Sequence, residues 1–339
     1  MISPERTDAI PSLPTPRRRP QLAVVLPAYR VRDQVEAVVR SLVDIADNII
    51  VVDDCCPEQS GAHLQKAFSH PKLQVLFHDK NQGVGGATTT GFQAALDAGA
   101  DIIVKMDSDG QMEARYLGRL IAPLANGKAD FAKGNRFYDL RALRSMPATR
   151  RFGNFGLTLL TKAASGFWHL SDPTNGFFAI RRNALDMVNF HLLDRRYFFE
   201  ISLLVQLNVI RAVALDIPIP AKYGDEQSSL SPFKALVSFP SKLVASLFHR
   251  IWWRYFIYDI NIVTIFLITG SILFFGGGTF GAYRWSQNWI EGHEQSAGTV
   301  ALAMLPMILG FQMLLQAVVL DMMESPSTPI SDILGQETL

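Results

Sequence analysis

The chain has 339 residues, of which 19% are charged and 48% hydrophobic, and its formal net charge is +1. This length is sufficient for one sizeable α/β domain and a further part. With a net charge so close to zero, the chain has no overall basic field of the kind that suggests nucleic-acid binding. The two cysteines, Cys55 and Cys56, are adjacent, which disfavours a disulfide between them and indicates a reducing, cytoplasm-facing environment.

Residues 1–20 are rich in proline and charge and contain no apolar run. A secretory signal peptide requires such a run, so the sequence predicts a disordered N-terminal tail over 1–20. The arginines at its end, Arg17 to Arg19, are expected to be solvated.

From Gln21 onward, short apolar runs alternate with stretches of helical spacing. The expected strands are 22–26, 48–52, 73–77, 101–106, 129–133, one within 171–182, and 212–217; the expected helices are 31–45, 83–98, 114–125, 149–164 and 197–210. This alternation predicts an α/β fold with a mostly parallel sheet covered by helices. Such sheets bind ligands at the C-terminal ends of their strands.

Three polar motifs follow predicted strands at that end: Pro27-Ala28-Tyr29, Asp53-Asp54 and Asp107-Ser108-Asp109. Two carboxylates two residues apart can converge on one Mg²⁺ or Mn²⁺, which prefers oxygen ligands and leaves positions open for phosphates. The alternative for Asp107 and Asp109 is an ordinary polar turn. Because all three motifs fall on one rim, the sequence favours a metal–diphosphate site.

A glycine-rich turn, 81–87, opens the predicted helix 83–98, so its backbone N–H groups could face a phosphate. The alternative is close packing of the helix on the sheet. The turn lacks the spacing of a nicotinamide-binding glycine motif and the Gly-Lys-Ser/Thr of a P-loop. A dehydrogenase would also leave Asp107 and Asp109 unexplained.

After Pro232 the composition becomes that of a membrane protein. Residues 232–258 mix basic and aromatic residues beside an apolar stripe, which predicts interfacial amphipathic helices, broken or kinked at Pro240. Two uncharged runs, 260–280 and 297–320, are each long enough, at roughly 20 residues, to cross a bilayer.

The orientation of these two spans follows from the flanking charges. Four basic residues precede the first span, whereas Arg284 is the single basic residue of the predicted loop between the spans, apart from histidine. The sequence therefore predicts a two-span region, 259–321, with the large domain and a C-terminal tail, 322–339, both in the cytoplasm.

The ordered motifs resemble family 2 glycosyltransferases, and more narrowly their polyprenyl-phosphate (dolichol-phosphate mannosyltransferase-like) branch. The resemblance covers about Leu22–Leu230. It rests on Pro27-Ala28-Tyr29, Val51-Val52-Asp53-Asp54, Asn81-x-Gly83-x-Gly85, Asp107-Ser108-Asp109-Gly110-Gln111, Gly134-Asn135-Arg136 and Asp172-x-Thr174-x-Gly176-Phe177. It implies a GT-A catalytic domain over 21–231 and transfer of a sugar from a nucleotide donor, such as a UDP- or GDP-hexose, to polyprenyl phosphate.

The resemblance also implies roles for individual residues. Asp107, Asp109 and Gln111 would hold Mg²⁺ or Mn²⁺ and the donor diphosphate. Arg136 and Arg151 would bind the lipid phosphate, with Asp172 orienting the acceptor loop. The remaining donor-binding residues would be Pro27, Ala28, Tyr29, Asp54, Gly83, Gly85, Lys222 and Ser228. Alternatives stay open: Arg150 competes with Arg151, both arginines suit surface ion pairs, and Asp172 suits a turn cap.

Sugar transfer to a polyprenyl phosphate requires no general base, because this acceptor is already an anion. Glu200 is the one nearby candidate base, and we expect a structural role for it. Two other hypotheses are transfer to a different membrane lipid acceptor, which would require a base, and a non-catalytic membrane scaffold. Two spans are few for moving the product across the bilayer, so we expect a separate flippase and a downstream transferase. Family members are often oligomeric, but the spans do not define a number.

Five residues in three segments depart from the family pattern. Arg30-Val31 replaces the usual Asn-Glu, Cys55-Cys56 replaces Gly-Ser, and Lys222 stands where arginine is common. These changes leave the metal site intact but prevent an assignment of the base or the sugar.

Overall fold

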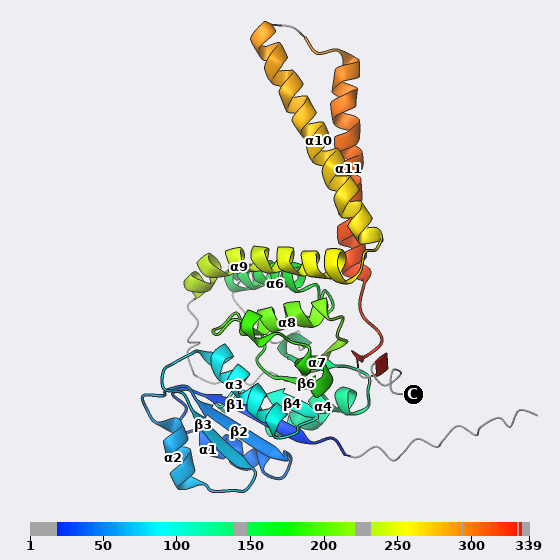
Figure 1. Cartoon of the computed structure of the whole chain (residues 1–339). Helices are drawn as coiled ribbons and strands as arrows, with labels where there is room; N and C mark the ends of the chain where they lie inside the picture. Colours follow the sequence, from blue (N-terminus) through cyan, green and yellow to red (C-terminus); the bar gives the residue numbers. More distant parts are fainter. Residues whose placement is uncertain (1–18, 139–147, 221–231, 293, 331, 334–339) are drawn as a thin grey trace, which may run out of the picture.

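A computed structural model describes residues 19–138, 148–220, 232–292, 294–330 and 332–333. Its centre is a seven-stranded sheet with the order β3-β2-β1-β4-β6-β5-β7 (Figure 1). The strands are β1 (Leu22–Ala28), β2 (Asn48–Asp53), β3 (Leu73–Phe77), β4 (Ile102–Lys105), β5 (Phe131–Asn135), β6 (Phe178–Arg181) and β7 (Ala214–Pro218). The prediction of a mostly parallel sheet is confirmed, with one exception: β6 runs antiparallel to both β4 and β5.

The described helices follow the predicted order with shifted ends. They are α1 (Val35–Leu42), α2 (Ser60–Ala67), α3 (Val84–Asp97), α4 (Leu117–Ala125), α6 (Ala148–Ser165), α7 (Arg182–Asp186), α8 (Phe199–Val209), α9 (Pro232–Trp252), α10 (Ile262–Glu291) and α11 (Ala297–Met323). Short 3₁₀ turns lie at Ala114–Tyr116, Arg136–Tyr138 and Phe190–Leu192, and a π-helical segment at Trp253–Tyr258. Helices α2 and α7 were not predicted, because they are short and lack a long apolar stripe.

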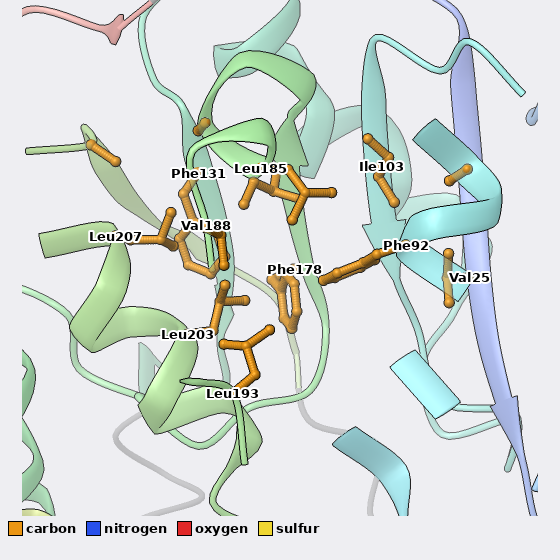
Figure 2. Packing of buried hydrophobic residues seen from close by; sticks show 14 of the residues in the cluster. Val25, Phe92, Ile103, Phe131, Phe178, Leu185, Val188, Leu193, Leu203 and Leu207 are labelled. Carbon is orange, nitrogen blue, oxygen red and sulfur yellow. The ribbon is translucent and has the colours of Figure 1, made fainter. Parts of the chain in front are cut away.

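The sheet separates two hydrophobic clusters. Val25 of β1 faces the cluster that α3 and α8 cover, in which Phe92 and Phe178 meet edge to face with ring centroids 6.2 Å apart (Figure 2). Val24 faces the opposite cluster, where α1 and α4 contribute Val39 and Leu120. Burying each such side chain contributes about 1.5–3 kcal/mol. These two layers hold the strand ends in place.

Helix α9 lies along one end of the domain, over α6 and α8 (Figure 1). The predicted break at Pro240 does not occur, since α9 is one continuous helix from Pro232 to Trp252. Phe239 and Leu243, on either side of Pro240, are both buried in one cluster with Phe198. This shared packing offsets the hydrogen bond that proline removes.

Helices α10 and α11 form a hairpin that projects away from the domain (Figure 1). Both are long and apolar enough to cross a membrane. Glycines let the two backbones approach: a Cβ at Gly310 would lie 2.4 Å from the nitrogen of Phe274, and one at Gly277 would lie 2.8 Å from the oxygen of Ala303. The predicted loop position of Arg284 is wrong, because α10 continues past it to Glu291.

The chain returns to the α/β domain after α11. Ile330 is buried in the hydrophobic cluster that contains Phe131 of β5, and its N–H donates to the Asp130 carboxylate at 3.0 Å and 3.1 Å. Pro329 and Ile330, in the predicted tail, are therefore buried against the domain. The hairpin thus begins and ends on the side of the α/β domain.

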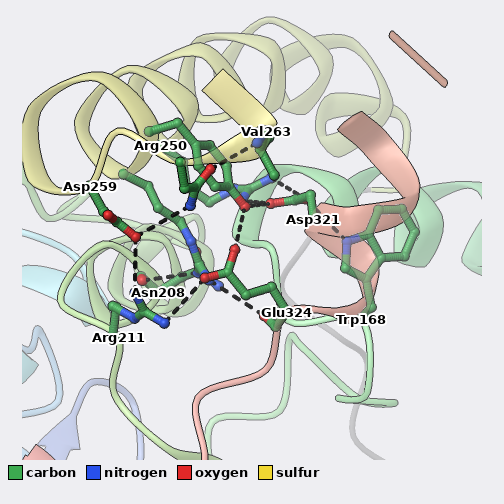
Figure 3. A network of polar contacts seen from close by, with 11 residues as sticks. Trp168, Asn208, Arg211, Arg250, Asp259, Val263, Asp321 and Glu324 are labelled. Atoms are coloured by element: carbon green, nitrogen blue, oxygen red, sulfur yellow. Dashed lines mark hydrogen bonds and ion pairs between the residues drawn. The ribbon is translucent and has the colours of Figure 1, made fainter. Parts of the chain in front are cut away.

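A polar network joins α9, α11 and the π-helical segment at the base of the hairpin (Figure 3). The Arg250 guanidinium is 1% exposed and binds both oxygens of Asp321, at 2.7 Å and 2.9 Å. It also donates to the oxygens of Ala163 and Ala164 at the end of α6. Tyr255 donates its hydroxyl to Asp321 at 2.6 Å. Asp321 thus neutralises a buried cation that holds three helices together.

We expect the substitution Asp321→Ala to destabilise the protein by about 3–5 kcal/mol, because Arg250 would remain buried without its counter-ion. The matched control is Asp259→Ala, whose pair with Arg211 is about half exposed on both sides. An exposed pair of this kind contributes about 0–1 kcal/mol. Thermal unfolding of both variants in detergent checks the difference, and equal melting temperatures would contradict it.

Candidate active site

The three polar motifs lie on one edge of the sheet, as predicted. Strands β1 and β2 are parallel and in register from Ala23 to Ala28, so Ala28 and Asp53 end neighbouring strands side by side. Strand β4 pairs with the other side of β1. The Ser108 hydroxyl then donates to the oxygen of Pro27 at 2.7 Å, which ties the turn after β4 to the end of β1. One rim therefore carries Tyr29, Asp54, Asp107 and Asp109.

The carboxylates of Asp53 and Asp54 both accept hydrogen bonds from backbone N–H groups. Asp53 accepts from the N–H groups of Cys56 and Gly61 and so fixes the start of α2. Asp54 accepts from the N–H groups of Gln82 and Gly83, at 2.8 Å and 2.7 Å, and contacts His78. The buried Asp54 side chain, predicted to line the nucleoside pocket, holds the glycine turn in place.

The glycine turn packs against the segment that precedes α8. A Cβ at Gly83 would lie 2.5 Å from the oxygen of Arg195, and one at Gly85 would lie 2.2 Å from the oxygen of Asp194. The N–H of Gly86 donates to the Arg195 oxygen at 3.0 Å. These contacts favour close packing over the expectation that the turn faces a phosphate.

Two of the residues that depart from the family pattern, Arg30 and Cys55, have unusual backbone angles. Arg30 has a φ of 58° and Cys55 a φ of 53°, both in the left-handed region that favours glycine. Arg30 places its guanidinium 5.4 Å from the ring of Tyr29, and its N–H donates to the Cys56 sulfur. Tyr29 itself is 42% exposed, so its ring is accessible at the rim.

The Asp107–Gln111 turn presents two carboxylates. Asp107 is 35% exposed, and Asp109 accepts from the N–H of Gln111 at 2.9 Å across a turn that Gly110 makes with a φ of 77°. Within the described residues, no three His, Cys, Asp or Glu side chains form a ready metal site. A pair of carboxylates still suits Mg²⁺ or Mn²⁺, because phosphates and water complete such sites. Gln111 is exposed beside them.

A buried lysine lies directly behind Asp107. The Lys105 ammonium is 2.6 Å from Oδ1 of Asp107 and 3.4 Å from Oε1 of Glu200. Burial alone lowers the pKa of Lys105, but the two carboxylates outweigh it and raise that pKa. Glu200, the one candidate base considered from the sequence, is thus engaged in an ion pair, as a structural role requires.

Arg136 and Asp172 form a bidentate ion pair. Nε and Nη2 of Arg136 bind the two Asp172 oxygens at 2.7 Å and 3.1 Å, and Asp172 is fully buried. The Arg136 side chain is 40% exposed, so one side of the guanidinium remains accessible. Arg136 therefore forms an ion pair, the alternative to phosphate binding that the sequence left open, and its partner is Asp172.

The loop after Asp172 rests on β5. Lys133, fully buried, donates to the oxygen of Asn175, and the Asn175 amide donates to the oxygen of Gly134 at 2.7 Å. Burial lowers the pKa of Lys133 to about 8. Asp216 accepts from the N–H of Ser171, and burial raises its pKa.

Sequence reasoning did not select Lys105, Lys133, Asn175 or Asp216. For the lysines, the available signal was a lysine directly after apolar strand residues, Ile102–Val104 in β4 and Phe131-Ala132 in β5, since lysine is almost never fully buried without a partner. Of the other predicted residues, Arg151 belongs to α6 but its side chain lies outside the described residues, as do Lys222 and Ser228.

Comparison with known proteins agrees with this geometry. The profile of glycosyl transferase family 2 matches residues 23–188. A UDP-N-acetylglucosamine–dolichyl-phosphate N-acetylglucosaminyltransferase of Methanococcus voltae is 30% identical over 188 residues, which is 51% of this chain and 74% of the relative. An undecaprenyl-phosphate mannosyltransferase of Micrococcus luteus is 25% identical over 206 residues, or 59% of this chain and 82% of the relative.

Among solved structures, glucosyl-3-phosphoglycerate synthase from Mycobacterium tuberculosis, crystallised with Mn²⁺, uridine diphosphate and phosphoglyceric acid, matches with a TM-score of 0.51. The match covers 68% of this chain and 78% of that chain at 18% identity, and so concerns the fold alone. The expected GT-A fold is confirmed, and the chain belongs to glycosyltransferase family 2.

Proposed function

We propose that the protein transfers a sugar from a nucleotide-sugar to a polyprenyl phosphate at a membrane surface. One edge of the sheet supports this proposal. It bears Asp107 and Asp109 and, directly after β5, Arg136, whose side chain is 40% exposed. The same domain is clamped to an apolar hairpin through Arg250 and Asp321. A soluble donor and a lipid acceptor could both reach such a site.

The names of the relatives support the acceptor more than the sugar. Both cited relatives are named for a polyprenyl-phosphate acceptor, one dolichyl and one undecaprenyl. Their sugars differ, N-acetylglucosamine in one and mannose in the other. We therefore leave the sugar open between UDP- and GDP-hexoses.

On the donor side, Asp107, Asp109 and Gln111 would hold Mg²⁺ or Mn²⁺ together with the donor diphosphate. When bound, the cation neutralises negative charge on the leaving diphosphate. Asp109 and Gln111 are pre-ordered for this role by the hydrogen bond between the Asp109 carboxylate and the Gln111 N–H. Tyr29 at the same rim offers an exposed ring to the nucleoside.

On the acceptor side, Arg136 would bind the lipid phosphate, with Arg151 as a second proposed ligand. The planar guanidinium pairs with phosphate oxygens, and Asp172 fixes its plane through two hydrogen bonds. The phosphate is already an anion and attacks the sugar carbon without a general base. Glu200 is paired with Lys105, which argues against a hydroxyl acceptor that would need that base.

Exposed aromatic residues lie at both ends of the hairpin and support a hairpin that spans the membrane. Trp252 and Tyr258 are 56% and 61% exposed at its base, and Tyr283 and Trp285 are 59% and 68% exposed near its tip. Between Ile262 and Tyr283, α10 rises about 32 Å, close to the roughly 30 Å thickness of a bilayer core. We propose that α9 lies in the interface, with the catalytic domain and the C-terminal segment on the cytoplasmic side.

The test is incubation of the detergent-purified chain and Mg²⁺ or Mn²⁺ with a panel of UDP- and GDP-sugars and a polyprenyl phosphate. We expect a chloroform-soluble sugar lipid from one donor. Polyprenol and diacylglycerol, which lack the phosphate nucleophile, should give none. Transfer to diacylglycerol alone would favour the other lipid acceptor, and no transfer from any donor would contradict the proposal.

The substitution Asp109→Asn should lower kcat by about 10²–10³-fold, because the leaving diphosphate loses charge stabilisation. Asp186→Asn provides the control: its side chain is 48% exposed in an ion pair with Arg182, and it follows β6, whose last residue Arg181 pairs with Ile102 at the start of β4, the opposite edge of the sheet. Steady-state transfer rates of the two variants check this. A wild-type rate in Asp109→Asn would place the metal elsewhere.

Gly176→Ala tests the space behind the carboxylates. The added Cβ would lie 2.3 Å from the Lys105 nitrogen and 2.9 Å from Oδ2 of Asp107, so we expect Mn²⁺ binding in the presence of nucleoside diphosphate to weaken about 10-fold or more. Gly118→Ala in α4, where nothing lies within 4 Å, should bind Mn²⁺ normally. Equal affinities in the two variants would count against this role for Asp107.

A further inference from the structure

A charged amine is buried immediately behind the proposed metal site. Lys105 is the last residue of β4 and is 1% exposed. The three preceding strand residues are Ile102, Ile103 and Val104, all buried and apolar. Burying an ammonium group is costly unless it is paired and hydrogen-bonded. A valine or isoleucine would satisfy the packing of the strand, so the lysine needs another explanation.

The ammonium group of Lys105 contacts two carboxylates. Nζ of Lys105 lies 2.6 Å from Oδ1 of Asp107 and 3.4 Å from Oε1 of Glu200. The absence of a side chain at Gly176 leaves the room for this approach, since a Cβ there would lie 2.3 Å from Nζ. Residues from β4, α8 and the loop before β6 thus combine to place one cation against Asp107.

This arrangement makes the two oxygens of Asp107 different. Oδ1 accepts the hydrogen bond from Lys105, whereas Oδ2 accepts none from the described residues. The side chain of Asp107 is 35% exposed, in contrast to the 1% of Lys105. One oxygen is therefore anchored inside the domain, while the Asp107 side chain as a whole remains partly exposed.

We propose that Lys105 is a positioning residue: it anchors Oδ1 of Asp107 so that the carboxylate keeps a fixed orientation toward the metal–diphosphate, and Glu200 holds Lys105 in place. This inference rests on the proposed function, because it assumes that Asp107 binds the metal. The competing explanation is that Lys105 only neutralises the buried Glu200. The two explanations differ in what happens when Glu200 and Lys105 lose their charges together.

The experiment compares Lys105→Met, Glu200→Gln and the double variant in the full-length chain. Two quantities are measured for each: the melting temperature, and the affinity for Mn²⁺ by electron paramagnetic resonance in the presence of UDP or GDP, whichever the wild type binds. Lys105→Met should weaken Mn²⁺ binding by about 10–100-fold, the usual effect of losing a hydrogen-bond partner of a metal ligand. Its melting temperature should also fall, because Glu200 is left buried without a partner.

The double variant decides between the two explanations. Removing both charges should restore much of the melting temperature, while the Mn²⁺ affinity stays weak because Asp107 still lacks its anchor. Glu200→Gln alone should weaken Mn²⁺ binding less than Lys105→Met does, because the glutamine amide oxygen can still accept a hydrogen bond from Lys105. If the double variant binds Mn²⁺ as the wild type does, Lys105 merely neutralises Glu200 and the inference is overturned.

The same measurements separate this inference from the proposed function. Mn²⁺ binding with a nucleoside diphosphate requires no acceptor, so failure to transfer sugar to polyprenyl phosphate leaves the comparison intact. If the wild type binds no Mn²⁺ with either nucleotide, both the proposed metal site and the role of Lys105 fail.

Discussion

Two buried lysines determine how the active-site edge is assembled. Lys105 on β4 and Lys133 on β5 lie inside the sheet and cannot remain there unpaired. Lys105 is met by Asp107 and Glu200, and Lys133 donates to the oxygen of Asn175. Satisfying the two ammonium groups therefore brings together the turn after β4, the start of α8 and the loop before β6. The proposed metal site and acceptor loop lie next to these two buried ammonium groups.

A second buried cation links the domain to the hairpin. Arg250 of α9 binds Asp321 of α11 and the last carbonyl oxygens of α6. Helix α6 begins near Arg151, a proposed ligand of the lipid phosphate, and ends at this cation. The hairpin that would fix the depth of the protein in the membrane is thus connected by one helix to the acceptor side of the site. Ile330, whose N–H donates to the Asp130 carboxylate, adds a further attachment from the C-terminal segment.

The sequence predicted what depends on periodic patterns and strand ends: the mostly parallel sheet, the rim motifs and the two apolar spans. It could not predict how polar atoms are shared. Asp54 proved to bind the glycine turn, and Gly83 and Gly85 to contact the Asp194–Arg195 backbone, because those partners come from distant segments. Pro240 did not break α9, since burial of Phe239 and Leu243 outweighs the lost hydrogen bond. Local propensity does not contain these tertiary contacts.

In the proposed reaction a sugar alone, without its phosphate, moves to the oxygen of a polyprenyl phosphate. Mass spectrometry of the lipid formed from the wild-type chain, the preferred nucleotide-sugar and a polyprenyl phosphate of defined length tests this. We expect the mass of the starting lipid plus one sugar residue, with a nucleoside diphosphate released. A product with an additional phosphate, or release of a nucleoside monophosphate, would contradict it.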